Sequence, residues 1–318
     1  MRDETGQIPL HLHFIWIGSQ LPWFAKLAIG SALRRVPGAR VSLWATHDLT
    51  HDEHVAALQT DERFALGQLN ERTLFDDAPS SLPLDLLMEQ FRDLDAPAAR
   101  SNIARLLLLA RFGGIYLDTD TTTLRDLSPL CALGGFCGLE HVVWPLSSEN
   151  LRAYRFFGGR VRSVLRRACA SVPHGERAFA PLSRWYSTAA NNAVLGFTQG
   201  HNFVLATLRR VAELSAEDRL RRYRLGTYLL QEMLEQRAER DGVTLLSPAH
   251  FYPLGPVISR QYFHARNDVT SAVAAIVKPE TYLIHWYASV SELRPYDEAR
   301  VQCERDRNVF ARLAYDAL

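Results

Sequence analysis

The segment RFGGIYLDTDTTTL, residues 111–124, constrains the fold more than any other stretch of the chain. An apolar repeat at helical spacing covers residues 98–111, and the glycine pair that follows is placed to end that helix. The run Ile-Tyr-Leu after the glycines has the pattern of a short buried strand. Asp118 and Asp120 come directly after it. Because ligands of open α/β sheets lie beyond the carboxyl ends of strands, the two carboxylates are expected at a site.

The chain before this segment predicts a parallel sheet. Residues 8–17 cluster apolar side chains as a buried strand does, residues 23–36 have a helical pattern, and residues 40–45 form a second strand. This strand, helix, strand succession is a βαβ unit. It favours an α/β fold of the Rossmann-like type with a mostly parallel central sheet.

The chain after it is less regular. Three segments have helical patterns, at residues 151–170, 202–214 and 223–241. Residues 282–286 have the pattern of a final strand. No internal repeat, low-complexity segment or linker is evident, so the economical interpretation is one domain over residues 1–318 with a helical insertion near residues 145–190.

Composition excludes several classes of protein. Hydrophobic residues make up 47% of the 318 residues and charged residues 22%, as in a globular chain with a sizeable core. The 36 basic and 35 acidic side chains nearly cancel, so no global field favours nucleic acid as a partner. The four cysteines lack the spacing of a zinc site or a disulfide scaffold, which favours reduced thiols in a cytoplasmic protein. The acidic amino terminus is unlike a signal peptide, and any membrane contact is expected to be peripheral.

The carboxylates of Asp118 and Asp120 are candidate metal ligands. In an extended segment the residues at i and i+2 face the same side, so both can converge on a hard cation such as Mn²⁺ or Mg²⁺. The blander alternative is a loop in which the acids cap the next turn. A second alternative is a haloacid-dehalogenase-like phosphatase with Asp118 as nucleophile. That family would put the segment on its first strand and require a downstream lysine before an acidic pair, whereas here Lys278 precedes Pro279-Glu280.

Asn102 and Arg105 stand three residues apart, hence on one face of the helix before the glycines. The guanidinium of Arg105 has the donors to reach a phosphate or a sugar hydroxyl. The alternative is an arginine paired with a nearby acid on a solvated face.

The segment SNIARLLLLARFGGIYLDTD, residues 101–120, resembles the signature of the DXD-containing sugar-binding glycosyltransferases. This group includes polysaccharide mannosyl- and galactosyltransferases and is akin to the glucosylating bacterial toxins. The openings IPLHLHFIWIGSQLP and VSLWAT are similar to its first two strands, and the likeness extends over most of residues 8–289. The resemblance implies a GT-A type fold, a metal-dependent retaining transfer, and a nucleotide-sugar donor, UDP-linked in preference to GDP-linked. The acceptor would be a hydroxyl of a glycan, a lipid-linked glycan or another molecule, as in polysaccharide biosynthesis.

The resemblance also implies residue roles. Trp16, with Ile17 beside it, would stack on the nucleotide base. Arg105 would contact the donor sugar or phosphates, and Asp118 the ribose or sugar and the water shell of the metal. Asp120 would ligate the metal, and His285 or Ser289 would complete the metal and diphosphate site. Asn191 and Asn192 would belong to a downstream loop that lines the donor site.

Two positions depart from the family pattern. Asn102 stands where the family usually has Asp, which keeps a hydrogen-bonding group but removes a charge. Val290 stands where a Ser-Trp pair is common, and Trp286 is the nearest candidate to substitute. These departures leave open a non-catalytic protein that binds a nucleotide-sugar without turnover.

A basic segment follows the central motif. Residues 152–168 carry six arginines with three aromatic residues between them. One interpretation is contact with an anionic or lipid-linked acceptor at a membrane surface. The alternative is a solvated helix over the core.

Overall fold

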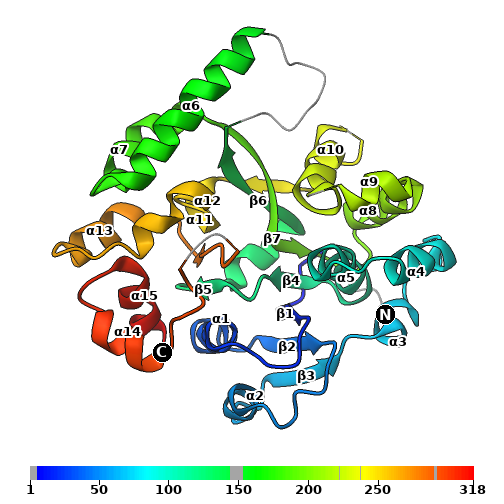
Figure 1. Cartoon of the computed structure of the whole chain (residues 1–318). Coiled ribbons are helices and arrows are strands. Elements are labelled where there is room, and N and C mark those ends of the chain that lie inside the picture. Colours follow the sequence, from blue (N-terminus) through cyan, green and yellow to red (C-terminus); the bar gives the residue numbers. More distant parts are fainter. Residues whose placement is uncertain (1–5, 144–152, 222, 237, 290–291) are drawn as a thin grey trace.

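The computed structural model describes residues 6–143, 153–221, 223–236, 238–289 and 292–318, with side chains from residue 158 onward in the helix that begins at Ala153. Within these residues the core is one seven-stranded sheet (Figure 1). Its strands, in spatial order, are β3 (Phe64–Gln68), β2 (Arg40–Ala45), β1 (His11–Trp16), β4 (Gly114–Leu117), β7 (Ser187–Phe197), β6 (Gly135–Val142) and β8 (Thr244–Leu246).

The sheet is mostly parallel. β7 alone among the described strands of the sheet pairs antiparallel with its neighbours, and every other pairing is parallel. A separate two-stranded antiparallel sheet joins β5 (Thr121–Thr123) to β9 (Leu283–His285). The predicted α/β class with a mostly parallel central sheet is therefore confirmed.

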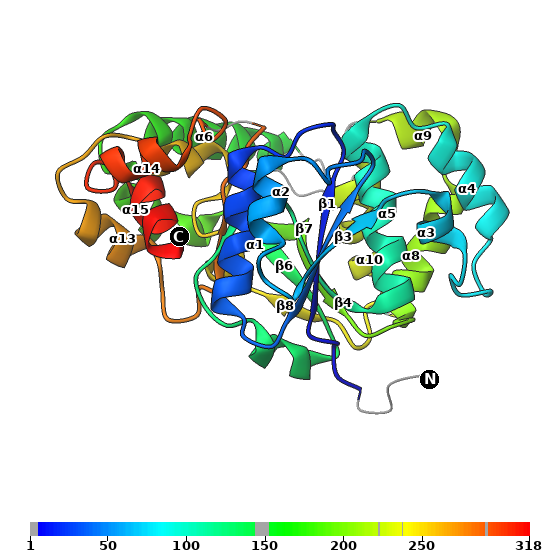
Figure 2. The same cartoon turned by 90° about the horizontal axis from the view of Figure 1, so that it is seen from below.

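Helices cover both faces of the sheet (Figure 2). One face carries α1 (Trp23–Arg35) and α2 (Glu53–Leu58), with α15 (Val309–Ala317) packed against α1. The other carries α3 (Glu71–Phe75), α4 (Leu84–Arg92), α5 (Pro97–Phe112), α8 (Asn202–Glu213) and α10 (Leu229–Glu235). The remaining helices are α6 (Ala153–Ser171), α7 (Gly175–Leu182), α9 (Ala216–Leu220), α11 (Pro248–Phe251), α12 (Gly255–Ile258), α13 (Val269–Ile276) and α14 (Glu298–Glu304). Short 3₁₀-helices lie at Ser128–Leu133, Ser183–Trp185 and Ser259–Tyr262, and Arg224–Tyr228 is a π turn.

The alternation of β1 explains the two hydrophobic clusters. Leu12 and Phe14 belong to the cluster on the α1 face, whereas Ile15 belongs to the cluster on the α5 face. Successive side chains of a strand point to opposite faces, so a strand buried on both faces must be apolar on both. This pattern is what made the first strand visible in the sequence.

The glycine pair is required by the turn from α5 into β4. Gly113 and Gly114 have φ angles of +63° and +98°, a region that L side chains rarely adopt. A Cβ atom on Gly114 would lie 2.3 Å from the carbonyl oxygen of His11 on the neighbouring strand. The ring of His13 hydrogen-bonds through Nε2 to the carbonyl of Gly113 at 2.9 Å. The glycines therefore let the chain leave α5 and pass directly into β4, packed closely against β1.

Most predicted elements match, and three expectations were wrong in detail. A turn at residues 119–120 follows Asp118, so Asp118 to Asp120 are not one extended segment, and among the described residues of the helix predicted at 223–241 only 224–235 are helical. Asn191 and Asn192, predicted in a loop, lie within β7. Asparagine is a poor strand former, but here the register of β7 against β6 jumps between Leu195 and Asn191, and this bulge accommodates the pair.

Helices α6 and α7 lie between β6 and β7, inside the insertion predicted near residues 145–190. The helical part ends by Trp185, because β7 begins at Ser187. The single-domain organisation stays a prediction. Among the described helices, none combines the length and apolarity needed to cross a bilayer.

Candidate functional site

The turn that holds Asp118 and Asp120 connects the central sheet to the small sheet. The amide of Asp118 donates to the carbonyl of Ala193 in the bulge of β7 at 2.8 Å. The hydroxyl of Thr121 donates back to the carbonyl of Asp118 at 2.9 Å. β5 starts at Thr121, which pairs directly with His285 on β9. The turn is thereby fixed at both ends, with His285 beside it.

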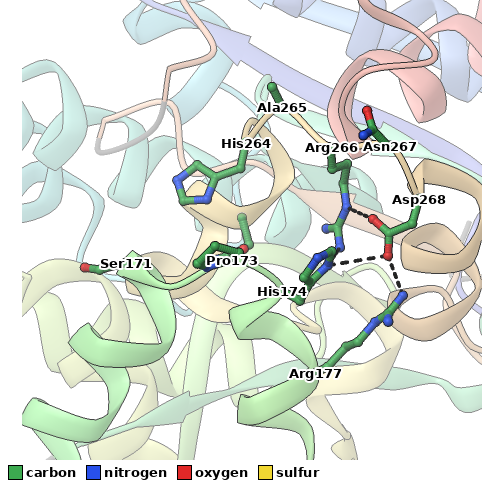
Figure 3. A pocket seen from close by; sticks show the side chains of 10 residues that line it. Ser171, Pro173, His174, Arg177, His264, Ala265, Arg266, Asn267 and Asp268 are labelled. Atoms are coloured by element: carbon green, nitrogen blue, oxygen red, sulfur yellow. Dashed lines mark hydrogen bonds and ion pairs between the residues drawn. The ribbon is translucent and has the colours of Figure 1, made fainter.

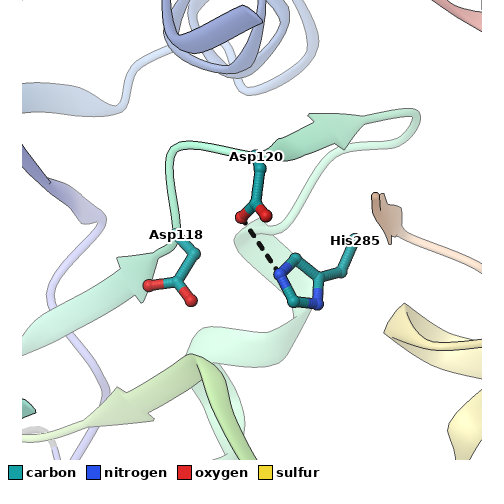
Figure 4. A group of neighbouring side chains, drawn as sticks. All are labelled: Asp118, Asp120 and His285. Atoms are coloured by element: carbon teal, nitrogen blue, oxygen red, sulfur yellow. Dashed lines mark hydrogen bonds and ion pairs between the residues drawn. The ribbon is translucent and has the colours of Figure 1, made fainter. Parts of the chain in front are cut away.

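Asp118, Asp120 and His285 form one cluster (Figure 4). Each can offer one ligand atom, and these atoms all lie within 4.8 Å of one another. His285 Nε2 is 3.0 Å from Asp120 Oδ1, and the amide of Ala288 donates to Asp120 Oδ2 at 2.7 Å. The Nδ1 atom of His285 is buried without a hydrogen-bond partner in the described part of the chain. Two carboxylates and an imidazole suit a divalent cation such as Mn²⁺ or Mg²⁺, so the residues present fit a metal.

Burial and mutual charge perturb these three groups. Burial raises the pKa of Asp118, and the charge of Asp120 raises it further against the opposing effect of Arg105. Burial also acts to raise the pKa of Asp120, but the charge and hydrogen bond of His285 outweigh it, so this pKa is lowered. Burial lowers the pKa of His285, yet the charge of Asp120 and its hydrogen bond more than compensate and leave it raised. The pair Asp120 and His285 is therefore an ion pair when no cation is bound.

Arg105 lies beneath Asp118 and is almost fully buried. Its Nη1 is 3.2 Å from Asp118 Oδ1, and it also donates to the carbonyl of Asn192. Its Nε and Nη2 atoms bond to the backbone carbonyl and the hydroxyl of Ser101 at 3.2 and 3.1 Å. The guanidinium also lies over the ring of Tyr116, 4.4 Å from its centroid. With its donors occupied inside the protein, Arg105 holds Asp118 in place; its predicted contact with the donor stays a prediction.

The predicted asparagines lie in two directions from this centre. The Asn192 amide donates to Asn102 Oδ1 at 2.7 Å, which ties α5 to β7. Gly226 packs against this pair, since a Cβ there would lie 2.8 Å from Asn192 Nδ2. Asn191 is buried, and its Oδ1 accepts from the amide of Ala193 at 2.8 Å.

Trp16 and Ile17 lie at the carboxyl end of β1, the same edge of the parallel sheet as Asp118. Both are partly exposed. The indole of Trp16 donates to the carbonyl of Gln20 at 2.7 Å and meets Phe24 edge to face. The partly exposed ring of Trp16 is accessible for stacking at this edge, and its contact with a nucleotide base stays a prediction.

The carboxyl-terminal candidates separate into surface and core. Ser289 is exposed one residue beyond Ala288, and Val290 falls outside the described residues. Trp286 is 1% exposed and its indole donates to Thr122 Oγ1 at 2.7 Å, so it is a core residue with its polar atom satisfied. It cannot substitute for a surface tryptophan.

Sequence reasoning missed Tyr116 and Tyr287, which contact members of this cluster, and Glu140, which contacts Tyr287. Tyr116 donates its hydroxyl to Asp118 Oδ1 at 2.7 Å, and the alternation of β4 could have indicated it. Glu140 on β6 accepts from the Tyr287 hydroxyl at 3.0 Å, and the Tyr287 ring lies against His285. No sequence signal links Glu140 to Tyr287, which are 147 residues apart.

A second charged group lies between α7 and α13 and borders a cavity of about 650 Å³ (Figure 3). Arg266 pairs with Glu176 and Asp268 at 2.8 Å each, and Arg177 pairs with Asp268 at 2.5 Å. None of the predicted site residues lines this cavity. We call these four residues the Arg266 cluster.

Residues 25–134, which include both aspartates, match the family model described as a glycosyltransferase sugar-binding region containing a DXD motif. This part of the chain is therefore similar to that sugar-binding region. The predicted family resemblance is confirmed, and the family is one of glycosyltransferases. No curated protein sequence matches the chain.

Several solved structures resemble the whole chain at low identity. A PaToxG glycosyltransferase is 14% identical, with a TM-score of 0.46, over 98% of this chain and 87% of its own. The galactosyltransferase LgtC, in complex with donor and acceptor sugar analogs, is 14% identical, with a TM-score of 0.44, over 96% and 95%. Mouse xyloside xylosyltransferase 1 in its apo form is 15% identical, with a TM-score of 0.45, over 88% and 98%.

Proposed function

We propose that the chain transfers a sugar from a nucleotide-sugar to an acceptor hydroxyl, with a divalent cation held by Asp118, Asp120 and His285. The observation that carries this proposal is the convergence of the three ligand atoms within 4.8 Å, two of them from the aspartates of the region that matches the family model. Bound Mn²⁺ or Mg²⁺ would neutralise charge on the departing diphosphate. The donor we expect is a UDP-sugar, and the transfer is expected to retain anomeric configuration.

The residues around the cluster supply rigidity. Tyr116 and Arg105 hold one oxygen of Asp118, and the Ala288 amide holds one oxygen of Asp120. Preorganised groups of this kind stabilise a charged transition state better than mobile ones, because they need not reorient as charge develops. Trp16 and Ile17 would receive the base at the same sheet edge, while Asn191, Asn192 and Ser289 would line the donor.

The outer face of α6 supports an acceptor at a membrane surface. Val161 and Val164 are 43% and 65% exposed, and Arg167 is exposed one turn further on. Residues 151–175 contain no acidic residue. Apolar side chains between arginines suit an anionic bilayer, where each basic residue contributes about 1 kcal/mol. The acceptor we favour is therefore lipid-linked.

Vesicle sedimentation tests this part. The wild type should sediment with phosphatidylglycerol vesicles and not with phosphatidylcholine vesicles. The V164E/R167E variant should lose that binding, while R72E, on α3, should keep it. Equal sedimentation of wild type and V164E/R167E would remove the membrane from the proposal and leave the transfer reaction untouched.

A thermal-shift panel tests the reaction class. UDP- and GDP-sugars are added with Mn²⁺ or with a chelator to the wild type and to Asp120→Asn. A ligand that binds only the folded state stabilises it by about 2.7 kcal/mol at a hundredfold excess over Kd. One donor should raise the wild-type melting temperature only with metal, and the variant should not respond. Slow release of free sugar from that donor would then separate an enzyme from a protein that only binds it.

A further inference from the structure

Glu140 is a buried carboxyl near the end of β6 that the sequence had not indicated. It is 8% exposed and accepts a hydrogen bond from the Tyr287 hydroxyl at 3.0 Å. The side-chain amide of Asn191 hydrogen-bonds to the same carboxyl. A buried carboxyl held by two donors is fixed in position, and so are the groups that hold it.

Tyr287 connects this carboxyl to the candidate metal site through its ring and through the backbone that follows it. Its ring lies against the ring of His285, with centroids 4.1 Å apart. Its φ angle is +57°, in the left-handed region that is costly for a bulky residue. The next residue, Ala288, then directs its amide to Asp120 Oδ2 at 2.7 Å. The strained backbone thus brings a ring to His285 and an amide to Asp120 at once.

Strain of this kind persists only where contacts hold it. Among the described residues, the polar contact made by the Tyr287 side chain is the one to Glu140. If that contact is lost, the backbone is free to relax out of the left-handed region. The Ala288 amide and the packing on His285 then move together.

We propose that Glu140 is a positioning residue, acting through Tyr287, that holds His285 and the Ala288 amide in the geometry required for cation binding. This inference rests on the proposed function for the identity of the ligand. It names no step in the transfer and requires no contact between Glu140 and the substrate. Outer contacts that orient metal ligands are typically worth 10- to 100-fold in metal affinity.

A second carboxyl held by a tyrosine and an asparagine lies elsewhere in the chain and provides a control. Glu304 on α14 accepts from the Tyr296 hydroxyl at 2.6 Å and from the Asn308 amide at 2.8 Å. Like Glu140, it is a carboxyl held by one tyrosine and one asparagine, although Arg300 also pairs with it at 2.9 Å, and it lies away from the three candidate ligands. The variant E304A therefore controls for the loss of such a network without loss of positioning.

The experiment measures Mn²⁺ affinity by electron paramagnetic resonance of free Mn²⁺, without any donor. Y287F and E140A should each weaken binding roughly 10-fold or more. The double variant should bind Mn²⁺ no less tightly than the single variant with the lower affinity, because both substitutions remove the same contact. E304A should bind as the wild type does. Wild-type affinity in Y287F, or additive losses in the double variant, would overturn the proposal.

A second measurement needs no metal. The imidazole nitrogen resonances of His285 in the metal-free protein should shift in Y287F and E140A and stay unchanged in E304A. Failure of the wild type to bind Mn²⁺ would defeat the metal site of the proposed function and the binding role given to Glu140. Binding by the wild type with unchanged affinity and unchanged His285 resonances in the variants would defeat the positioning role alone. Y287F removes a single oxygen atom, so a folding failure is not expected to obscure the result.

Discussion

The Asp118, Asp120 and His285 cluster and the Arg266 cluster are both acids paired with bases, yet they differ in what they can release. In the Arg266 cluster, Glu176 and Asp268 are neutralised by guanidinium groups, which do not lose their protons in proteins. In the first cluster, Asp118 is also paired with a guanidinium, that of Arg105, but Asp120 is paired with an imidazole. An imidazole can lose its proton and become a metal ligand. A cation can therefore enter one cluster by displacing a proton, whereas the other is permanently closed.

The largest expected effect comes from removing a ligand from the cluster of Asp118, Asp120 and His285. Asp120→Asn removes a charged ligand, and we expect sugar transfer to fall by about 100-fold or more, since electrostatic groups at a transition state are worth this much or more. Initial rates at saturating donor and Mn²⁺ measure it. The matched variant Asp268→Asn should keep the wild-type rate. Equal losses in the two variants would mean that the clusters do not differ in the way described.

The next largest effect comes from removing the central arginine of the Arg266 cluster. Arg266→Ala leaves Glu176, whose side chain is 1% exposed, as a buried charge without its closest partner. Removing one partner of a buried pair costs about 3–5 kcal/mol of unfolding free energy. Urea denaturation measures this loss. Mn²⁺ affinity of the folded variant should be unchanged, and a weakened affinity would contradict the separation of the two clusters.

The same contrast shows how far the sequence could be read. Asp118 and Asp120 are adjacent in the chain, and the glycines before them fix a strand end, so local pattern located them. His285 reaches them only because β5 pairs with β9, and that pairing left no local signal beyond the family resemblance. The contacts of Glu140 with Tyr287 and of Arg266 with Glu176 join distant segments, and buried polar partners follow no periodicity that a sequence displays.

β7 illustrates the remaining error. The family resemblance implied a loop at Asn191 and Asn192, and the low strand propensity of asparagine gave no signal against it. The strand forms because β4 and β6 flank it on both sides, and the bulge gives the asparagines room. Tertiary pairing outweighs local preference here, as it does wherever a strand is central.

The pH dependence of stability should differ between the two clusters, and this effect is smaller than the two above. Burial lowers the pKa of His285, but the charge of Asp120 and its hydrogen bond outweigh burial and raise this pKa above its usual value of 6.5. Its contribution to stability is therefore fully present below pH 6.5 and is lost as the pH rises through the folded-state pKa. Burial lowers the pKa of His11 and His141 to about 4, so these two do not titrate in this window.

The melting temperature of the metal-free protein should accordingly fall as the pH rises from 6 toward 9, and Asp120→Asn should flatten this fall. Mn²⁺ affinity should increase over the same range, because the cation competes with the proton on His285. Melting curves with a chelator and with Mn²⁺ measure both trends. A wild-type fall that persists undiminished in Asp120→Asn would assign the titration to a different group.

The smallest expected effect sharpens the comparison at its two histidines. His174 Nδ1 lies 3.4 Å from Asp268 Oδ2, but Asp268 also has Arg266 and Arg177, and the His174 side chain is 48% exposed. Its φ angle is +56°, which favours glycine. His174→Gly loses this contact and a hydrogen bond of 2.8 Å between Arg266 Nη2 and His174 Nδ1, but it relieves an unfavourable backbone conformation, so the unfolding free energy should stay within about 1 kcal/mol of wild type. Mn²⁺ affinity should not change. His285→Asn should weaken Mn²⁺ binding strongly in the same assay, because His285 has no substitute at Asp120, whereas Asp268 keeps two arginines when His174 is gone.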